Sequence, residues 1–165
     1  MRLFLASYAT IECYEELRNA LSPYFDAKWV EPKNLHLTWY FLGEHPDAAP
    51  FVERLQALSM IPRLPMTLRG LGIFGKPDPT VLYAATSSVV GKVLHEKVAE
   101  LLGLEPDPRF TPHVTLARVK TTHPGWKEAP APWQERELGQ VESTIYLIQS
   151  HLTPQGPIYI PLESF

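Results

Sequence analysis

The pattern that most limits the fold of this chain is a unit that occurs twice. In each copy an apolar strand leads into a helix, and a later strand carries the sequence His-x-Thr. The first strands, residues 2–10 and 80–88, align at an offset of 78, and His36 and His113 lie 77 residues apart. Chance can align short apolar strands, but the order and spacing favour a duplication. Two such units predict two lobes about a pseudo-two-fold axis, with the His-x-Thr strands facing each other across a cleft.

The periodicity of apolar residues predicts the other elements. Helices are expected over residues 11–22, 48–59 and 89–102, with Thr10 and Ser88 as N-caps. The buried face of the third helix is expected to carry Val90, Val93, Leu94, Val98, Leu101 and Leu102. Strands are expected over residues 2–8, 35–42, 65–74, 80–86, 113–119, 140–150 and 157–162. The predicted fold class is α+β: bilobal duplicated strand–helix–strand units, two antiparallel sheets around a central cleft and helices outside. No linker divides the chain, so residues 1–165 are expected to form a single domain with two lobes.

Alternation along residues 35–42 places His36, Thr38 and Tyr40 on one face. The opposite face, which includes Trp39 and Phe41, is wholly apolar and is therefore expected to face the core. Each His-x-Thr strand thus presents an imidazole and a hydroxyl side by side.

His113 and Thr115 likewise share a face of the strand over residues 113–119. Strict alternation places Arg118 on the opposite face, so it reaches the cleft only if a bulge or the strand end turns it. The segment 109–127 contains four basic residues and no acidic one, which favours a local site for an anion.

Two imidazoles near neutral pH can divide the work of a general acid and a general base. The neutral imidazole takes a proton from a nucleophile, and the protonated one gives a proton to a leaving oxygen. Threonine hydroxyls can donate to the non-bridging oxygens of a substrate and stabilise developing negative charge. The set is typical of in-line displacement at phosphorus without a metal or a covalent intermediate.

Composition excludes several classes of protein. The chain has 165 residues, 45% hydrophobic and 20% charged, which does not fit a disordered tail protein, and no apolar run approaches the ~20 residues of a membrane span. The N-terminus does not fit a signal peptide. The single cysteine, Cys13, excludes an intramolecular disulfide and a cysteine-rich zinc site, so a cytoplasmic location is expected. A net charge of −3 gives no global basic field for nucleic acid.

Two segments carry a resemblance to a known family: HLTWYFLG at residues 36–43 and FTPHVTLAR at residues 110–118. They resemble the paired motifs of the two-histidine phosphoesterase superfamily, and most closely its RNA 2′,3′-cyclic phosphodiesterase branch, also called bacterial and archaeal 2′-5′ RNA ligases. The segments RLFLA (2–6), WVEPKNLHLT (29–38) and SHLTPQGPIY (150–159) also agree, so the resemblance covers nearly the whole chain.

The resemblance implies hydrolysis of RNA ends that carry a 2′,3′-cyclic phosphate to 2′-phosphomonoesters, with reversible 2′-5′ ligation as a second reaction. It implies that His36 is the general acid and His113 the general base. Thr38 and Thr115 would bind phosphate oxygens, and Arg118 would help to bind the phosphate end. No metal and no other cofactor is implied, no membrane is involved, and a monomer is expected.

Two other functions stay open at this point. The chain could be a non-catalytic module that binds RNA ends, or a phosphodiesterase for a small cyclic nucleotide. The remaining histidines have structural interpretations: His95 is expected at a surface or boundary position, and His45, His123 and His151 in or near loops. Trp126, Trp133, Tyr40 and Phe110 lie near the motifs and are candidates either for stacking on a base or for packing.

Overall fold

The computed structural model describes all 165 residues and contains ten strands, three α-helices and three short 3-10 helices. The strands are β1 (Arg2–Ile11), β2 (Phe25–Trp29), β3 (His36–Glu44), β4 (Met66–Arg69), β5 (Leu71–Phe74), β6 (Val81–Ala85), β7 (His113–Thr122), β8 (Glu137–Val141), β9 (Tyr146–Thr153) and β10 (Gly156–Ser164). The helices are α1 (Tyr14–Leu21), α2 (Ala49–Leu55) and α3 (Ser88–Leu102), and the 3-10 helices are Pro32–Asn34, Gln56–Met60 and Ala131–Trp133. Every strand pairing is antiparallel, and the predicted α+β class is confirmed.

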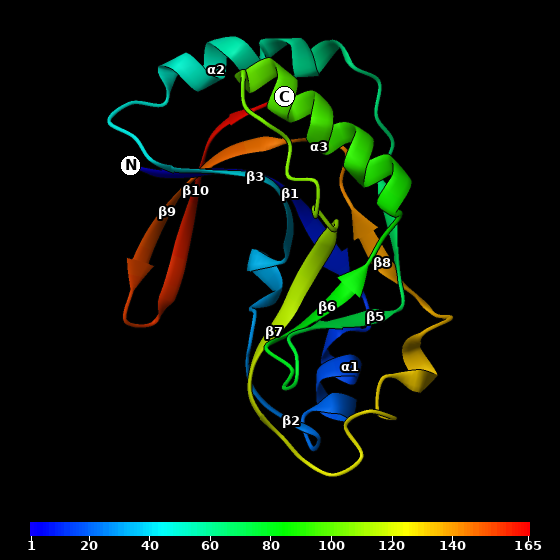
Figure 1. Ribbon diagram of the computed structural model, residues 1–165. Coiled ribbons are helices and arrows are strands. Elements are labelled where there is room, and N and C mark those ends of the chain that lie inside the picture. The colour runs from blue at the N-terminus through cyan, green and yellow to red at the C-terminus, as the bar shows by residue number, and fades with distance from the viewer.

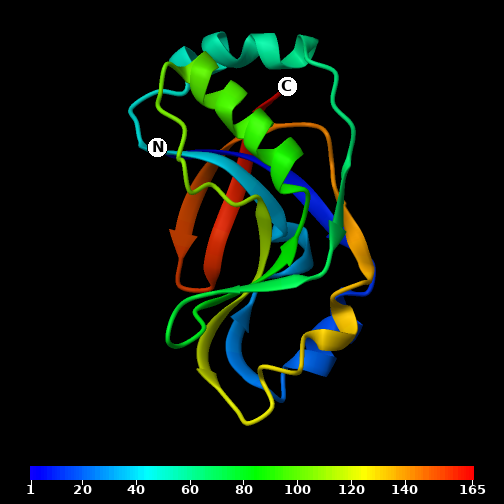
Figure 2. The same ribbon diagram turned by 45° about the vertical axis from the view of Figure 1, so that its right-hand side comes forward.

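The strands follow the order β10-β9-β1-β3-β7-β6-β5, with β2 beside β7 and with β8 joining β1 to β4. The two halves meet between β3 and β7, where only Leu37 and Val114 are in register. The helices α2 and α3 lie together at one end of the molecule, α1 lies at the other, and the β9–β10 hairpin extends to one side (Figures 1 and 2). A single paired position therefore joins the strands β10-β9-β1-β3 to the strands β7-β6-β5.

The strand register corrects the alignment of the repeat. Ser7 of β1 pairs with Leu37, and Ala84 of β6 pairs with Val114. The two units are therefore related by an offset of 77 in both strands, not by 78 in the first. The correction matters because a slip of one residue moves every side chain to the other face of a strand.

Thr10 is not a helix cap, contrary to the prediction. β8 pairs with Ala9–Ile11, which extends β1, and α1 begins only at Tyr14. Ser87 rather than Ser88 caps α3, because its hydroxyl accepts a hydrogen bond from the backbone N–H of Val90.

The predicted inner face of α3 is confirmed at Val98 and Leu102 but is wrong at Val90 and Val93. Val90 and Val93 are 53% and 63% exposed, whereas His95 is buried. Gly91 sets this orientation, since a β-carbon there would lie 2.5 Å from the ring of Pro112. The helix approaches that segment closely on the face that carries Gly91, His95, Val98, Ala99 and Leu102.

The predicted strand over 65–74 is two strands. Gly70 has a φ of 77°, a left-handed conformation that favours glycine and breaks the run. β4 then pairs with β8, and β5 pairs with β6. The predicted strand over 140–150 is likewise divided between β8 and β9.

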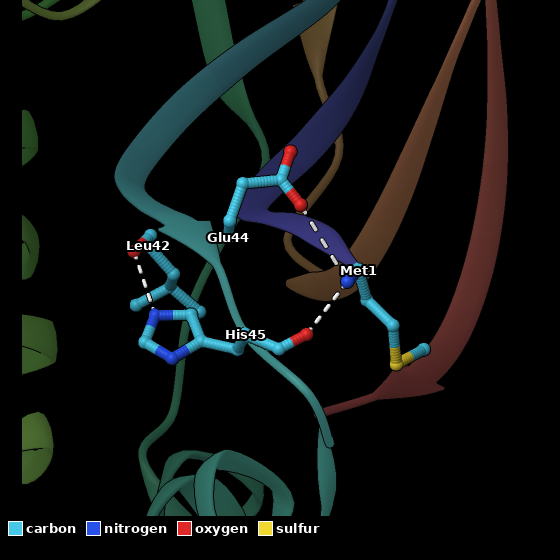
Figure 3. A network of polar contacts seen from close by, with 4 residues as sticks. All are labelled: Met1, Leu42, Glu44 and His45. Atoms are coloured by element: carbon cyan, nitrogen blue, oxygen red, sulfur yellow. Dashed lines mark hydrogen bonds and ion pairs between the residues drawn. The ribbon is translucent and has the colours of Figure 1, made fainter.

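The N-terminus is fixed to the end of β3 (Figure 3). The amino group of Met1 donates to the carbonyl of His45 at 2.6 Å and lies 3.5 Å from the carboxylate of Glu44. The ring of His45 bonds the carbonyl of Leu42 through Nε2 at 2.8 Å. This histidine therefore helps to close the end of β3. No helix of the structure has both the length and the apolar character needed to cross a membrane.

Candidate active site

The two His-x-Thr motifs lie side by side where the lobes meet. Because Leu37 pairs with Val114 in an antiparallel register, the position of His36 lies next to Thr115, and that of Thr38 next to His113. All four side chains are half-buried. No hydrogen bond within the protein uses either threonine hydroxyl, so both are free to bind a ligand.

Both imidazoles are held in the same way. Nδ1 of His36 lies 2.7 Å from the carbonyl of Asn34, and Nδ1 of His113 lies 2.6 Å from the carbonyl of Thr111. A carbonyl can only accept, so Nδ1 carries the proton in each ring. Nε2 is then the nitrogen that each histidine offers for proton transfer.

Each imidazole also packs against two aromatic rings. His36 lies between Phe4 and Tyr159, with centroid distances of 5.4 and 5.3 Å. His113 lies between Phe74 and Tyr83, at 4.9 and 5.3 Å. The rings fix the orientation of both imidazoles and exclude water from them.

This surrounding lowers the pKa of both histidines below the ordinary value, mainly through burial. The hydrogen bonds to backbone carbonyls oppose the shift, and the charge of Arg118 adds to it in both cases. The free site therefore favours two neutral imidazoles. A bound phosphate diester brings a negative charge that favours protonation of one of them.

A β-bulge turns Arg118 toward this site. Tyr83 of β6 pairs with Thr115, but the neighbouring residue of β6 pairs with Ala117, so Leu116 is an extra residue in β7. The bulge shifts the alternation by one position, and Arg118 lies on the same face as Thr115. Burial has the larger influence on the pKa of His36, His113 and Tyr159, but the charge of Arg118 acts to lower all three, which places the guanidinium near them.

A matching bulge occurs at Trp39 of β3, 77 residues earlier. It reverses the predicted placement of the next two side chains. Phe41, expected in the core, is 70% exposed and contacts Phe4 on the cleft face. Tyr40, expected beside His36, lies on the opposite face, where it stacks on His95.

The profile of the 2′-5′ RNA ligase superfamily matches residues 8–145. The chain belongs to this superfamily. A protein of Aeropyrum pernix named RNA 2′,3′-cyclic phosphodiesterase is 40% identical over 148 residues, which cover 80% of this chain and 81% of the relative. A protein of Thermus thermophilus with the same name is 35% identical and aligns over 100% of this chain and 89% of its own length.

Two solved structures superpose on this chain over nearly its whole length. The crystal structure of TT0787 of Thermus thermophilus superposes with a TM-score of 0.74 at 34% identity and covers 100% of this chain and 97% of its own. Escherichia coli LigT complexed with phosphate gives a TM-score of 0.66, covering 99% and 95% of the two chains. At 21% identity, this second likeness concerns the fold alone.

The cleft of this superfamily member contains residues that sequence reasoning missed. Tyr159, Phe74 and Tyr83 reach the histidines from strands whose pairing is not local. Lys28 was also missed: it pairs with Arg118 across β2 and β7, so both side chains share a face. The cross-strand register is the only signal for these residues, and a single sequence does not contain it.

The other predicted candidates lie elsewhere. His95 is buried rather than at the surface: its Nδ1 bonds the carbonyl of Trp39, its Nε2 accepts from the N–H of Asp107, and it stacks on Phe110. Phe110 is thus an anchor of the loop, and Trp133 is buried. The remaining residues are at the surface or partly so: His123 contacts Asp26, His151 is exposed, and Trp126 packs against Phe25. No group of three or more His, Cys, Asp or Glu side chains in the structure could hold a metal ion.

Proposed function

We propose that the chain hydrolyses 2′,3′-cyclic phosphate ends of RNA to 2′-phosphomonoesters. The observation that carries the proposal is the pair of equivalent imidazoles, each with Nδ1 fixed on a backbone carbonyl and Nε2 free. Relatives named RNA 2′,3′-cyclic phosphodiesterase at 40% and 35% identity support the choice of substrate. The whole chain is expected to act as one two-lobed unit, because each lobe supplies one of the two histidines.

In the proposed reaction, Nε2 of His113 accepts a proton from water as the water oxygen attacks phosphorus. The bond from phosphorus to O3′ breaks, and Nε2 of His36 gives its proton to that oxygen. The hydroxyls of Thr38 and Thr115 and the guanidinium of Arg118 donate to the phosphate oxygens and stabilise the developing charge. At the end of a turnover His113 is protonated and His36 is neutral. Proton exchange with solvent then restores the starting state of both histidines.

Ligation would use the same groups in the same roles: a 5′-hydroxyl takes the place of water, His113 accepts its proton, and His36 gives a proton to O3′ as the bond from phosphorus to O3′ breaks. Cleavage of the 2′-5′ linkage is the reverse, in which His36 accepts the proton of the 3′-hydroxyl and His113 gives one to the departing 5′-oxygen. The near-equality of the two imidazoles supports reversible 2′-5′ ligation as a secondary activity. Hydrolysis is the main activity we propose, because water is in large excess.

The test uses a short RNA with a 2′,3′-cyclic phosphate in the presence of EDTA. We expect rapid formation of a 2′-phosphate, lost by roughly 10²–10⁴-fold in His36→Ala and in His113→Ala. His151→Ala, which removes an exposed histidine, is the matched control and should act like wild type. Turnover that needs a divalent metal would refute metal independence. Binding without turnover would instead identify a module that recognises RNA ends.

A further inference from the structure

Three side chains from adjacent segments form a row on the cleft face, and it begins at His36. Tyr8 of β1 pairs with His36 of β3. On the other side of β1, the N–H of Glu142 donates to the carbonyl of Tyr8 at 2.9 Å. Paired residues of antiparallel strands point to the same face, so all three side chains do so here. Two strand spacings, roughly 10 Å, separate the first from the last.

Aromatic rings flank this row. Tyr146 of β9 pairs with Ala6, next to Tyr8, and the two tyrosine rings meet edge to face at 5.2 Å. Tyr159 stands against His36 on the same side. Burial and then the charge of Glu142 raise the pKa of Tyr8, and a hydrogen bond with Glu142 raises the pKa of Tyr146. The carboxylate of Glu142 therefore lies close to both rings.

A cavity of about 520 Å³ opens at the Tyr8 and Glu142 end of the row and extends along β1 and β8. Its polar side chains are Tyr8, Thr10, Gln140 and three carboxylates, Glu12, Glu137 and Glu142. The aromatic ring suits a flat, uncharged group, and the side-chain oxygens accept hydrogen bonds. The negative charges of these three carboxylates disfavour a phosphate there.

We propose that this cavity receives the base of the terminal nucleotide, and that Glu142 accepts hydrogen bonds from the N–H groups at the edge of that base. The inference rests on the proposed function, which puts the cyclic phosphate between His36 and His113. The ribose then leads away from His36 along the row, and the base reaches the tyrosines. Stacking on an aromatic ring is a general way of holding an unpaired base.

The carboxylate gives the site a preference among bases. Guanine presents two adjacent donors, N1–H and the exocyclic amino group, which one carboxylate can accept together. Uracil presents a single N–H between two carbonyl oxygens, and the carboxylate of Glu142 repels both oxygens. Guanine is therefore the best fit and uracil the poorest.

The experiment compares dinucleotides that end in guanosine or uridine 2′,3′-cyclic phosphate. For wild type we expect kcat/KM to favour guanosine by about 10-fold, within the range for one well-formed bidentate contact. Glu142→Gln should bring the ratio close to one. Glu96→Gln, on the exposed surface of α3, is the matched control and should keep the wild-type ratio. Tyr146→Leu should weaken both substrates alike, because stacking does not read the identity of the base.

Calorimetric titration with 2′-GMP and 2′-UMP separates this inference from the proposed function. If no substrate is turned over but 2′-GMP binds more tightly than 2′-UMP in a way that depends on Glu142, the function fails and the base site stands. If every cyclic phosphate is hydrolysed with equal efficiency, and Glu142→Gln changes neither turnover nor binding, the base site is refuted and the function stands.

Discussion

Replacement of Gly72 by alanine should damage the candidate site from a position that touches no substrate. A β-carbon at Gly72 would lie 2.1 Å from Cζ of Tyr83, whose ring covers this glycine. Ordinary contact begins at about 3.4 Å, so the ring must move by about 1.3 Å. Tyr83 is one of the two rings against which His113 is held, at 5.3 Å, so the displacement is passed to the imidazole.

The size of the effect follows from that displacement. Overpacking of this kind costs about 1–3 kcal/mol of unfolding free energy. A catalytic group misplaced by about 1 Å can cost on the order of 10²-fold in rate. We therefore expect Gly72→Ala to fold, with a lower midpoint in urea and with kcat/KM for a cyclic-phosphate RNA reduced on the order of 10²-fold.

A double-mutant cycle tests the reasoning. Tyr83→Ala removes the ring that the new β-carbon would strike. In that background, Gly72→Ala should change the unfolding free energy by less than about 0.5 kcal/mol and leave the residual activity unchanged. Additive effects of the two substitutions, or wild-type activity of Gly72→Ala alone, would show that the ring of Tyr83 does not position His113.

Two further outcomes concern stability. The unfolding free energy should fall as the pH drops below about 6.5, because His36 and His113 have lowered pKa values and take up protons more readily when the chain unfolds. Urea titrations at several pH values check this, and an unchanged pH dependence in the double variant His36→Asn/His113→Asn would contradict it. Arg63→Ala should cost about 2–4 kcal/mol, since the guanidinium donates to the carbonyls of Leu58, Ile61, Ser143 and Phe165. Lys33→Ala, which removes an exposed ion pair with Glu31, should cost under about 1 kcal/mol in the same assay.

The sequence alone predicts the central residues of the site, because each His-x-Thr pair lies within three consecutive residues. His36 with Thr38, and His113 with Thr115, share a face by simple alternation over three residues, and alternation holds there. It fails a few residues later, at the bulges of Trp39 and Leu116. A bulge depends on how the neighbouring strand pairs, and nothing within a single strand reports that.

Part of the buried face of α3 was missed for a related reason. Val98 and Leu102 are buried as predicted, but Val90 and Val93 are more apolar than Gly91 and His95, so hydrophobicity alone chooses the wrong residues in the first half of the helix. The close approach of Gly91 to Pro112 and the two hydrogen bonds of His95 compensate for that difference. Tertiary contacts of this kind override the pattern of a single helix.

The aromatic residues that pack against the two histidines were missed because they come from strands that pair over long distances in the chain. Tyr159 comes from the end of the chain and reaches His36 only because β10 pairs with β9, and β9 with β1. The pairing of β9 with β1 joins segments more than 100 residues apart. Alternation and composition do not specify such pairings, even where the strands themselves were expected.

The duplicated unit explains why the two imidazoles are alike, but its symmetry cannot distinguish the acid from the base. The last strands of the chain break that symmetry. β8 and β9 both pair with β1, and they bring Tyr146 and Glu142 to the side of His36. A bound nucleoside needs an extended surface of this kind to pack against, whereas an attacking water molecule does not. We therefore propose that the leaving sugar oxygen lies beside His36 and the water beside His113, which is the assignment that the motif resemblance also implies.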